Sequence, residues 1–175
     1  MAIRLPVITG LILLGSMAMA DEPRITITPG EHDRFAVQVD GQPFTVYRPR
    51  DADRPFFYPV LGPGGEHLTR RWPVEDAAAG EQQDHRHHRG FWYTHGAVNG
   101  HDFWTEGRGP KIVQTRAAVE QGHTLVTEND WIDAAGKTVC TDRRVHRFSA
   151  GANYRQIDID ITLVASHGQI GRAHV

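Results

Sequence analysis

A short stretch of the chain, DHRHHRGFWYTHGAVNGHDFWTEG at residues 84–107, concentrates side chains that can do chemistry. It holds five of the eleven histidines, two of the four tryptophans and three acidic residues. Imidazoles and carboxylates can transfer protons near neutral pH, and indole rings can stack on the apolar faces of sugars. The stretch therefore predicts a functional site, and the alternative is a polar, half-buried hairpin.

Three closely spaced histidines begin the stretch and follow an aspartate. If the segment is extended, His85 and His87 share one face and His88 opposes them. Two imidazoles and a carboxylate, completed by His95 or Glu106, would suit zinc, copper, manganese or iron. The spacing matches no specific metal motif. The sequence therefore leaves open a divalent metal site, a site where His and Arg bind an anionic or hydroxylated ligand, and a solvated loop.

The rest of the stretch predicts a hairpin around Asn99-Gly100, since Asn-Gly is a favoured two-residue turn. Its strands would cover residues 90–98 and 101–106. In this arrangement His95 and Glu106 are diagonal neighbours, about 7 Å apart at the backbone. Alternation places Trp92 on the more apolar face. The chemical face would carry Phe91, Tyr93, His95, Ala97, Asp102, Trp104 and Glu106.

This face has the chemistry of a sugar site. We expect His87 or His95 to act as general acid or base, with Asp102 or Glu106 as the carboxylate partner. Arg89 would orient a polar group of the ligand, and an indole ring would provide a stacking platform. The residues expected to bind substrate are Arg89, Trp92, Tyr93, Asn99 and Trp104.

Short alternating segments separated by turn residues predict an all-β fold around this stretch. Asp40-Gly41 predicts a two-residue hairpin turn, and residues 73–83 predict a helical turn or a surface loop. Spacing of this kind is typical of an antiparallel sandwich or barrel. Further strands are expected at residues 25–28, 35–39, 43–47, 54–61, 111–119, 123–133, 137–148 and 153–164.

The composition is that of one globular domain, with 39% hydrophobic and 23% charged residues in 175. The net charge of −2 argues against nucleic acid as a partner. Cys140 is the sole cysteine, so an intrachain disulfide is excluded and a packed, inert thiol is expected. The residues expected to be solvated are Arg70–Arg71 and Arg143–Arg144, and those expected to be structural or solvated are His32, His67, His123 and His146.

We expect neither end of the chain to belong to the mature domain. Residues 1–20 combine Arg4, a short apolar run and an Ala-Met-Ala site, which is typical of a secretory signal peptide. The run is too short to cross a bilayer comfortably, so no transmembrane span is expected after cleavage. Residues 169–175 match one translation of a sequencing adapter. We therefore expect an exported, periplasmic or extracellular protein whose β-sandwich domain, residues 21–168, is incomplete.

Two segments, RPFFYPVLGPGGEHLTRRWP and DHRHHRGFWYTHGAVNGHDFW, make the chain resemble the soluble PmoA-like family over residues 54–164. The chain carries Arg86 where that family usually has proline. The resemblance implies an antiparallel β-sandwich similar to the galactose-mutarotase-type supersandwiches. It covers Asp84, His85, His87, His88, Arg89, Trp92, His95, Gly96, Asn99, Gly100, Asp102, Phe103 and Trp104.

The family's label, "methane oxygenase PmoA", does not by itself set an activity. The methane monooxygenase subunit of similar name crosses the membrane several times, and no such span is expected here. We expect an exported carbohydrate-active enzyme, a sugar hydrolase, lyase or epimerase, with a small-molecule or carbohydrate ligand. The alternatives are a His-ligated metal-dependent oxygenase and a non-catalytic periplasmic sugar-binding module. The sequence leaves the cofactor, with a divalent metal ion as the candidate, and the oligomeric state open.

Overall fold

The structure, a computed structural model, describes residues 22–170. The predicted signal peptide, residues 1–20, and residues 171–175 of the adapter-like segment lie outside these residues. Within residues 22–170, no helix is both long enough and apolar enough to cross a membrane.

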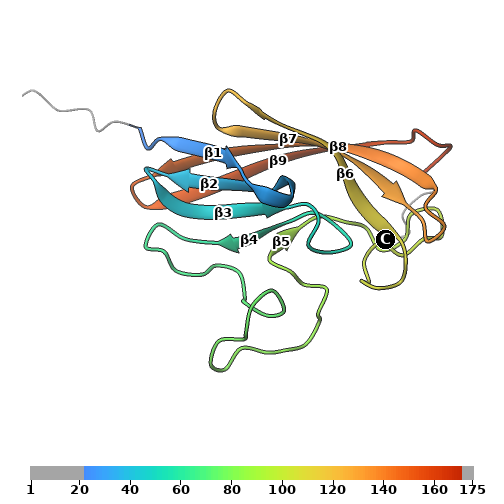
Figure 1. The fold of residues 1–175 in the computed structure, drawn as a ribbon, viewed down its shortest axis with the longest axis horizontal. Helices are drawn as coiled ribbons and strands as arrows, with labels where there is room; N and C mark the ends of the chain where they lie inside the picture. Colours follow the sequence, from blue (N-terminus) through green and yellow to red (C-terminus); the bar gives the residue numbers. More distant parts are fainter. Residues whose placement is uncertain (1–21, 171–175) are drawn as a thin grey trace, which may run out of the picture.

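Two antiparallel sheets form the molecule, as Figure 1 shows. Both are meanders, because consecutive strands pair with each other. The prediction of an all-β, antiparallel sandwich is confirmed. The five-stranded sheet contains β1 (Ile25–Pro29), β2 (Phe35–Val39), β3 (Gln42–Arg48), β4 (Phe56–Val60) and β5 (Phe91–Trp92), with a short 3-10 turn η1 (Glu31–Asp33) between β1 and β2. The four-stranded sheet contains β6 (Lys111–Glu120), β7 (Thr124–Ile132), β8 (Thr138–Gly151) and β9 (Tyr154–Val164).

The main core lies between the two sheets because alternate side chains of each strand point inward. Val37, Phe44 and Phe57 come from the five-stranded sheet, and Leu125 and Phe148 come from the other. The Asp40-Gly41 turn is confirmed, since both residues have the positive φ that a tight hairpin turn requires. Local alternation and turn chemistry therefore account for most of the sandwich.

A second apolar cluster lies under the loop that follows β5. It includes Phe103 from that loop and Trp131 and Cys140 from β7 and β8. Cys140 is fully buried, as expected, and burial raises the pKa of its thiol to about 11. This cluster anchors the histidine-rich stretch to the four-stranded sheet.

A buried ion pair on β8 corrects one expectation. Arg144 was expected to be solvated, but its side chain is only 3% exposed and its Nη2 lies 2.6 Å from Oδ2 of Asp142. Residues 142 and 144 share the inward face of β8, while Arg143 between them is exposed. Asp142 also accepts hydrogen bonds from Asn129 and Trp131. The inner face therefore carries a compensated charge pair.

The connection between β4 and β5 is long and extends away from both sheets in Figure 1. Residues 73–83 form turns and loop there, with no helix, which is the second of the two predicted forms. This connection ends in the histidine-rich stretch, which it brings to the edge of the sandwich.

Candidate functional site

The predicted hairpin over residues 90–98 and 101–106 is wrong in its strands and right in its turn. Only Phe91–Trp92 form a strand, and a single isolated bridge joins Val98 to His101. Asn99 and Gly100 have φ angles of 51° and 83°, as the predicted turn requires. The pairing therefore ends after the single bridge between Val98 and His101 that flanks this turn.

Hydrogen bonds between side chains and nearby backbone explain why the ladder stops. Asp102 Oδ1 accepts the backbone N–H groups of Trp104 and Thr105 at 2.8 and 3.1 Å. His95 Nδ1 accepts the backbone N–H of Ala97 at 3.3 Å. Such local bonds compete with a β-ladder for backbone groups. Burial would raise the pKa of Asp102, but the hydrogen bonds from Thr105 and Trp104 outweigh it and lower that pKa.

The curled backbone rearranges the expected chemical face. Trp92 and Trp104, expected on opposite faces, are in contact with ring centroids 4.8 Å apart. Among residues 22–170, no hydrogen bond or ion pair joins His95 to Glu106, the pair expected from the hairpin. Instead Glu106 accepts hydrogen bonds from Nε of Arg89, at 2.9 and 3.0 Å to its two oxygens. The dyad expected from the hairpin is therefore replaced by an Arg–Glu pair.

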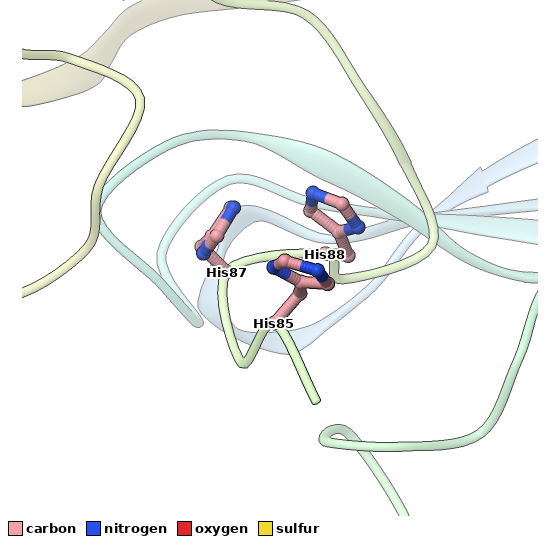
Figure 2. A group of neighbouring side chains, drawn as sticks. All are labelled: His85, His87 and His88. Carbon is pink, nitrogen blue, oxygen red and sulfur yellow. The ribbon is translucent and has the colours of Figure 1, made fainter. Parts of the chain in front are cut away.

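The three clustered histidines converge on one side of a tight turn, as Figure 2 shows. His85 has a φ of 39°, and its carbonyl accepts the backbone N–H of His88 at 2.9 Å. The segment is therefore not extended, and the expectation that His88 opposes the other two is wrong. One ligand nitrogen from each of His85, His87 and His88 lies within 4.8 Å of the others.

Arg70, from the long connection, holds this turn. Its guanidinium donates to the Asp84 carboxylate and to the carbonyls of Asp84 and His85, all at 2.7 Å. The hydrogen bond from Arg70 lowers the pKa of Asp84. Arg70 was expected to be solvated, and the structure corrects this, because its side chain is only 24% exposed.

Arg54 supports the site through hydrogen bonds to its backbone. The sequence analysis did not single out this residue. Its side chain is 3% exposed and donates to the carbonyls of His87 and Phe103 at 2.8 and 3.3 Å. The guanidinium also lies 4.1 Å from the ring centroid of Trp92 and 3.8 Å from Glu106. The available signal was a charged residue placed directly before the aromatic run PFFYP.

His87 and His88 both favour the neutral form of the imidazole. Burial, the neighbouring imidazole of His88 and the charge of Arg54 lower the pKa of His87. Burial and the neighbouring His85 likewise lower the pKa of His88. A neutral imidazole is the form that binds metal ions. The electrostatics of the turn are therefore compatible with a metal ion.

Trp104 contacts the cluster directly. Its indole Nε1–H donates to Nε2 of His87 at 3.0 Å, and its ring centroid lies 6.2 Å from that of His88. Trp92 lies 6.0 Å from His88. The structure thus brings together three imidazoles and two indoles, with the Arg89–Glu106 pair joined to them through Arg54.

Three of the expected site residues have contacts that lead away from the cluster. Tyr93 packs against Trp131, with ring centroids 6.4 Å apart. The amide of Asn99 donates to the Gln169 carbonyl at 3.0 Å. His95 accepts from the backbone of its own loop, as described above.

Gly90 lets the histidine turn lead into β5, and its replacement by alanine is expected to be costly. Its φ is +67°, and a Cβ there would lie 2.3 Å from the backbone oxygen of Phe57 on β4. The left-handed backbone alone costs alanine about 1 kcal/mol. We expect Gly90→Ala to lower the free energy of unfolding by at least about 1 kcal/mol more than Gly100→Ala in urea denaturation.

Gly100→Ala is the matched control, because Gly100 has a φ of +83° and a Cβ there would meet no atom within 4 Å. It shares the backbone strain and lacks the close approach. Equal losses of stability in the two variants would contradict the steric role of Gly90.

The comparisons with known proteins provide a family. A family model described as "Family of unknown function (DUF6807)" matches residues 34–172, which include the histidine-rich stretch and all strands except β1. No curated protein and no solved structure matches the chain. The resemblance to the PmoA-like family stays a prediction.

Proposed function

The chain belongs to the DUF6807 family of unknown function, and we propose that it is an exported, metal-dependent enzyme that acts on a carbohydrate. The observation that carries the proposal is the convergence of His85, His87 and His88, whose ligand nitrogens lie within 4.8 Å of one another. Export rests on the signal-like sequence of residues 1–20.

Three imidazoles are a suitable ligand set for zinc, copper or iron. Zinc binds histidine nitrogen at about 2.0–2.1 Å. The three ligand nitrogens, within 4.8 Å of one another, are close enough for one ion to be shared among them. Catalytic metal sites often combine three protein ligands with an open position for water or substrate. A bound divalent ion would act as a Lewis acid on a substrate oxygen.

Polar and aromatic groups around the cluster support a carbohydrate as the substrate. Trp104 is 43% exposed and could stack on a sugar ring. The Arg89–Glu106 pair and the Asp102 carboxylate offer donors and acceptors for hydroxyl groups. In this proposal His87 serves the metal, and His95 has no partner in an acid–base dyad.

Metal binding would release Trp104 from His87. If the ion binds Nε2 of His87, the lone pair that accepts the Trp104 N–H is used. If the ion binds Nδ1, the neutral imidazole must carry its proton on Nε2, which then faces another donor. Either geometry breaks the hydrogen bond of 3.0 Å. A change in tryptophan fluorescence is therefore expected when a metal ion binds.

We expect Zn²⁺ to bind one site per chain in protein that carries no affinity tag, and to change tryptophan fluorescence. His87→Ala should weaken this binding at least about 100-fold. Replacing a residue that only hydrogen-bonds to a metal ligand already lowers metal affinity about 10–100-fold, and His87 is itself a proposed ligand. His95→Ala is the matched control, since His95 lies in the same stretch and contacts Ala97 instead of the cluster. Calorimetric and fluorescence titrations with Zn²⁺, Cu²⁺ and Mn²⁺ provide the measurement.

Two outcomes would reject the metal centre. One is the absence of binding at millimolar metal by wild-type protein that is folded by circular dichroism. The other is equal affinity in wild type, His85→Ala, His87→Ala and His88→Ala. Turnover of a polysaccharide and aryl-glycoside panel that is lost on chelation and restored by metal would support the enzymatic part of the proposal.

Two second candidates follow from specific observations. A histidine-ligated oxygenase, the chemistry named by the PmoA-like label, would use the same three imidazoles. Copper or iron in stoichiometric amounts, with oxygen consumption, would favour it over a zinc hydrolase or lyase.

A non-catalytic sugar-binding module would use the exposed Trp104 as its platform. Sugar binding that survives chelation, without turnover, would favour the module.

A further inference from the structure

A separate cavity of about 120 Å³ lies between the two sheets, beside the histidine-rich stretch. Its walls include Tyr47, Phe57, Trp92, Tyr93, Arg144 and His146. Phe91, which also lines it, is 40% exposed, so the cavity lies close to the surface. An apolar protein cavity of about 150 Å³ accommodates benzene. The space is smaller than that reference cavity, so one six-membered ring is the largest unit that it could hold.

His146 lines this cavity with its imidazole ring, and the two ring nitrogens are buried without a partner among residues 22–170. The residue is 3% exposed, and neither of its ring nitrogens has a hydrogen-bond partner among the described residues. Phe57 and Tyr47 pack on the imidazole, with centroids 5.0 and 5.9 Å from it. A buried polar group without a partner is costly, so a ligand that supplies a hydrogen bond would be stabilised there.

The form of His146 defines what kind of group would satisfy it. Burial, with a further contribution from the Arg144 charge, lowers the pKa of His146 to about 3, while Asp142 acts in the opposite direction. The imidazole is therefore neutral near pH 7 and has one donor and one acceptor nitrogen. A hydroxyl group, which can both donate and accept, matches either nitrogen.

The charges around the cavity favour a neutral ligand. Arg144 is the cation in the wall, and Asp142 compensates it through three hydrogen bonds of 2.6–3.1 Å. A carboxylate ligand would find the charge of Arg144 already compensated by Asp142. A polyhydroxylated sugar would leave hydroxyls unpaired against the aromatic and aliphatic walls.

We propose that this cavity binds a small neutral phenol, with the ring held among the aromatic side chains and the hydroxyl hydrogen-bonded to His146. Trp92 belongs both to the cavity wall and to the surroundings of His88. The phenol site therefore adjoins the proposed metal centre, but it does not depend on a metal ion.

Calorimetric titration of the metal-free protein with phenol and toluene tests the proposal. The two probes have nearly the same shape and differ in the hydroxyl. We expect one phenol per chain and at least tenfold weaker binding of toluene. His146→Phe should remove this preference, and His123→Phe should retain it, because His123 is an exposed histidine outside the cavity.

If His146→Phe fails to fold, the comparison of phenol with toluene in the wild type still decides. Equal affinity for the two probes would overturn the role of His146. Failure of both to bind, or tighter binding of benzoate or glucose, would overturn the ligand class. A crystal soaked in phenol that shows only an ordered water at His146 would overturn the site. None of these results bears on metal binding by His85, His87 and His88.

Discussion

Replacing Asp142 with alanine is expected to lower the free energy of unfolding by about 3–5 kcal/mol. The carboxylate is completely buried and accepts hydrogen bonds from Asn129, Trp131 and Arg144. Its removal leaves a guanidinium that is 3% exposed without a counter-charge, and it deprives the Asn129 amide and the Trp131 indole N–H of an acceptor. Urea denaturation followed by tryptophan fluorescence would measure the loss.

Asp160→Ala is the matched control for this prediction. Asp160 also pairs with an arginine, Arg147, at 2.6 Å, but both side chains are largely exposed. An exposed pair of this kind contributes less than about 1 kcal/mol. If the two alanine variants lost similar stability, burial would not be the cause, and the account of the inner face of β8 would be wrong.

Replacing Arg54 with methionine is expected to lower the free energy of unfolding by about 3 kcal/mol, since hydrogen bonds to charged groups contribute roughly 1.5–3 kcal/mol each. Methionine retains much of the aliphatic volume but loses the bonds to the carbonyls of His87 and Phe103. It also loses the cation above Trp92. The same variant should bind Zn²⁺ at least about tenfold more weakly, because support behind the ligands tunes metal affinity.

Arg116→Met provides the comparison. Arg116 pairs with Glu128 at 3.2 Å, and its side chain is 68% exposed. Its replacement should cost less than about 1 kcal/mol and leave Zn²⁺ affinity unchanged. An Arg54→Met protein with wild-type stability and affinity would show that Arg54 does not organise the histidine turn.

The predictions for Asp142 and Arg54 indicate how the site and the scaffold are related. Asp142 and Arg144 stabilise the four-stranded sheet behind the cavity, whereas Arg54 links the segment before β4 to the histidine turn and to Phe103. Trp92 connects the two regions, because it lies under Arg54 and lines the cavity. Substitutions in either region should therefore change the environment of Trp92.

The sequence by itself determined the sandwich and the segment in which three histidines converge. Alternation and turn residues are local properties, so strands such as β2 and the Asp40-Gly41 turn were predicted within a residue or two. The density of histidine between residues 84 and 107 is also a local property, and within this segment His85, His87 and His88 converge.

Only the tertiary structure decided how these residues face one another. Hydrogen bonds of Asp102 and His95 to nearby backbone end the hairpin that alternation predicted, so Trp104 turns toward His87 and Glu106 pairs with Arg89. Arg54 and Arg70 bond to segments 33 and 14 or 15 residues away, which no local pattern reveals. The sequence does not distinguish His146 from other histidines on strands. Its burial results from the packing of the opposite sheet, which depends on strands distant in the sequence.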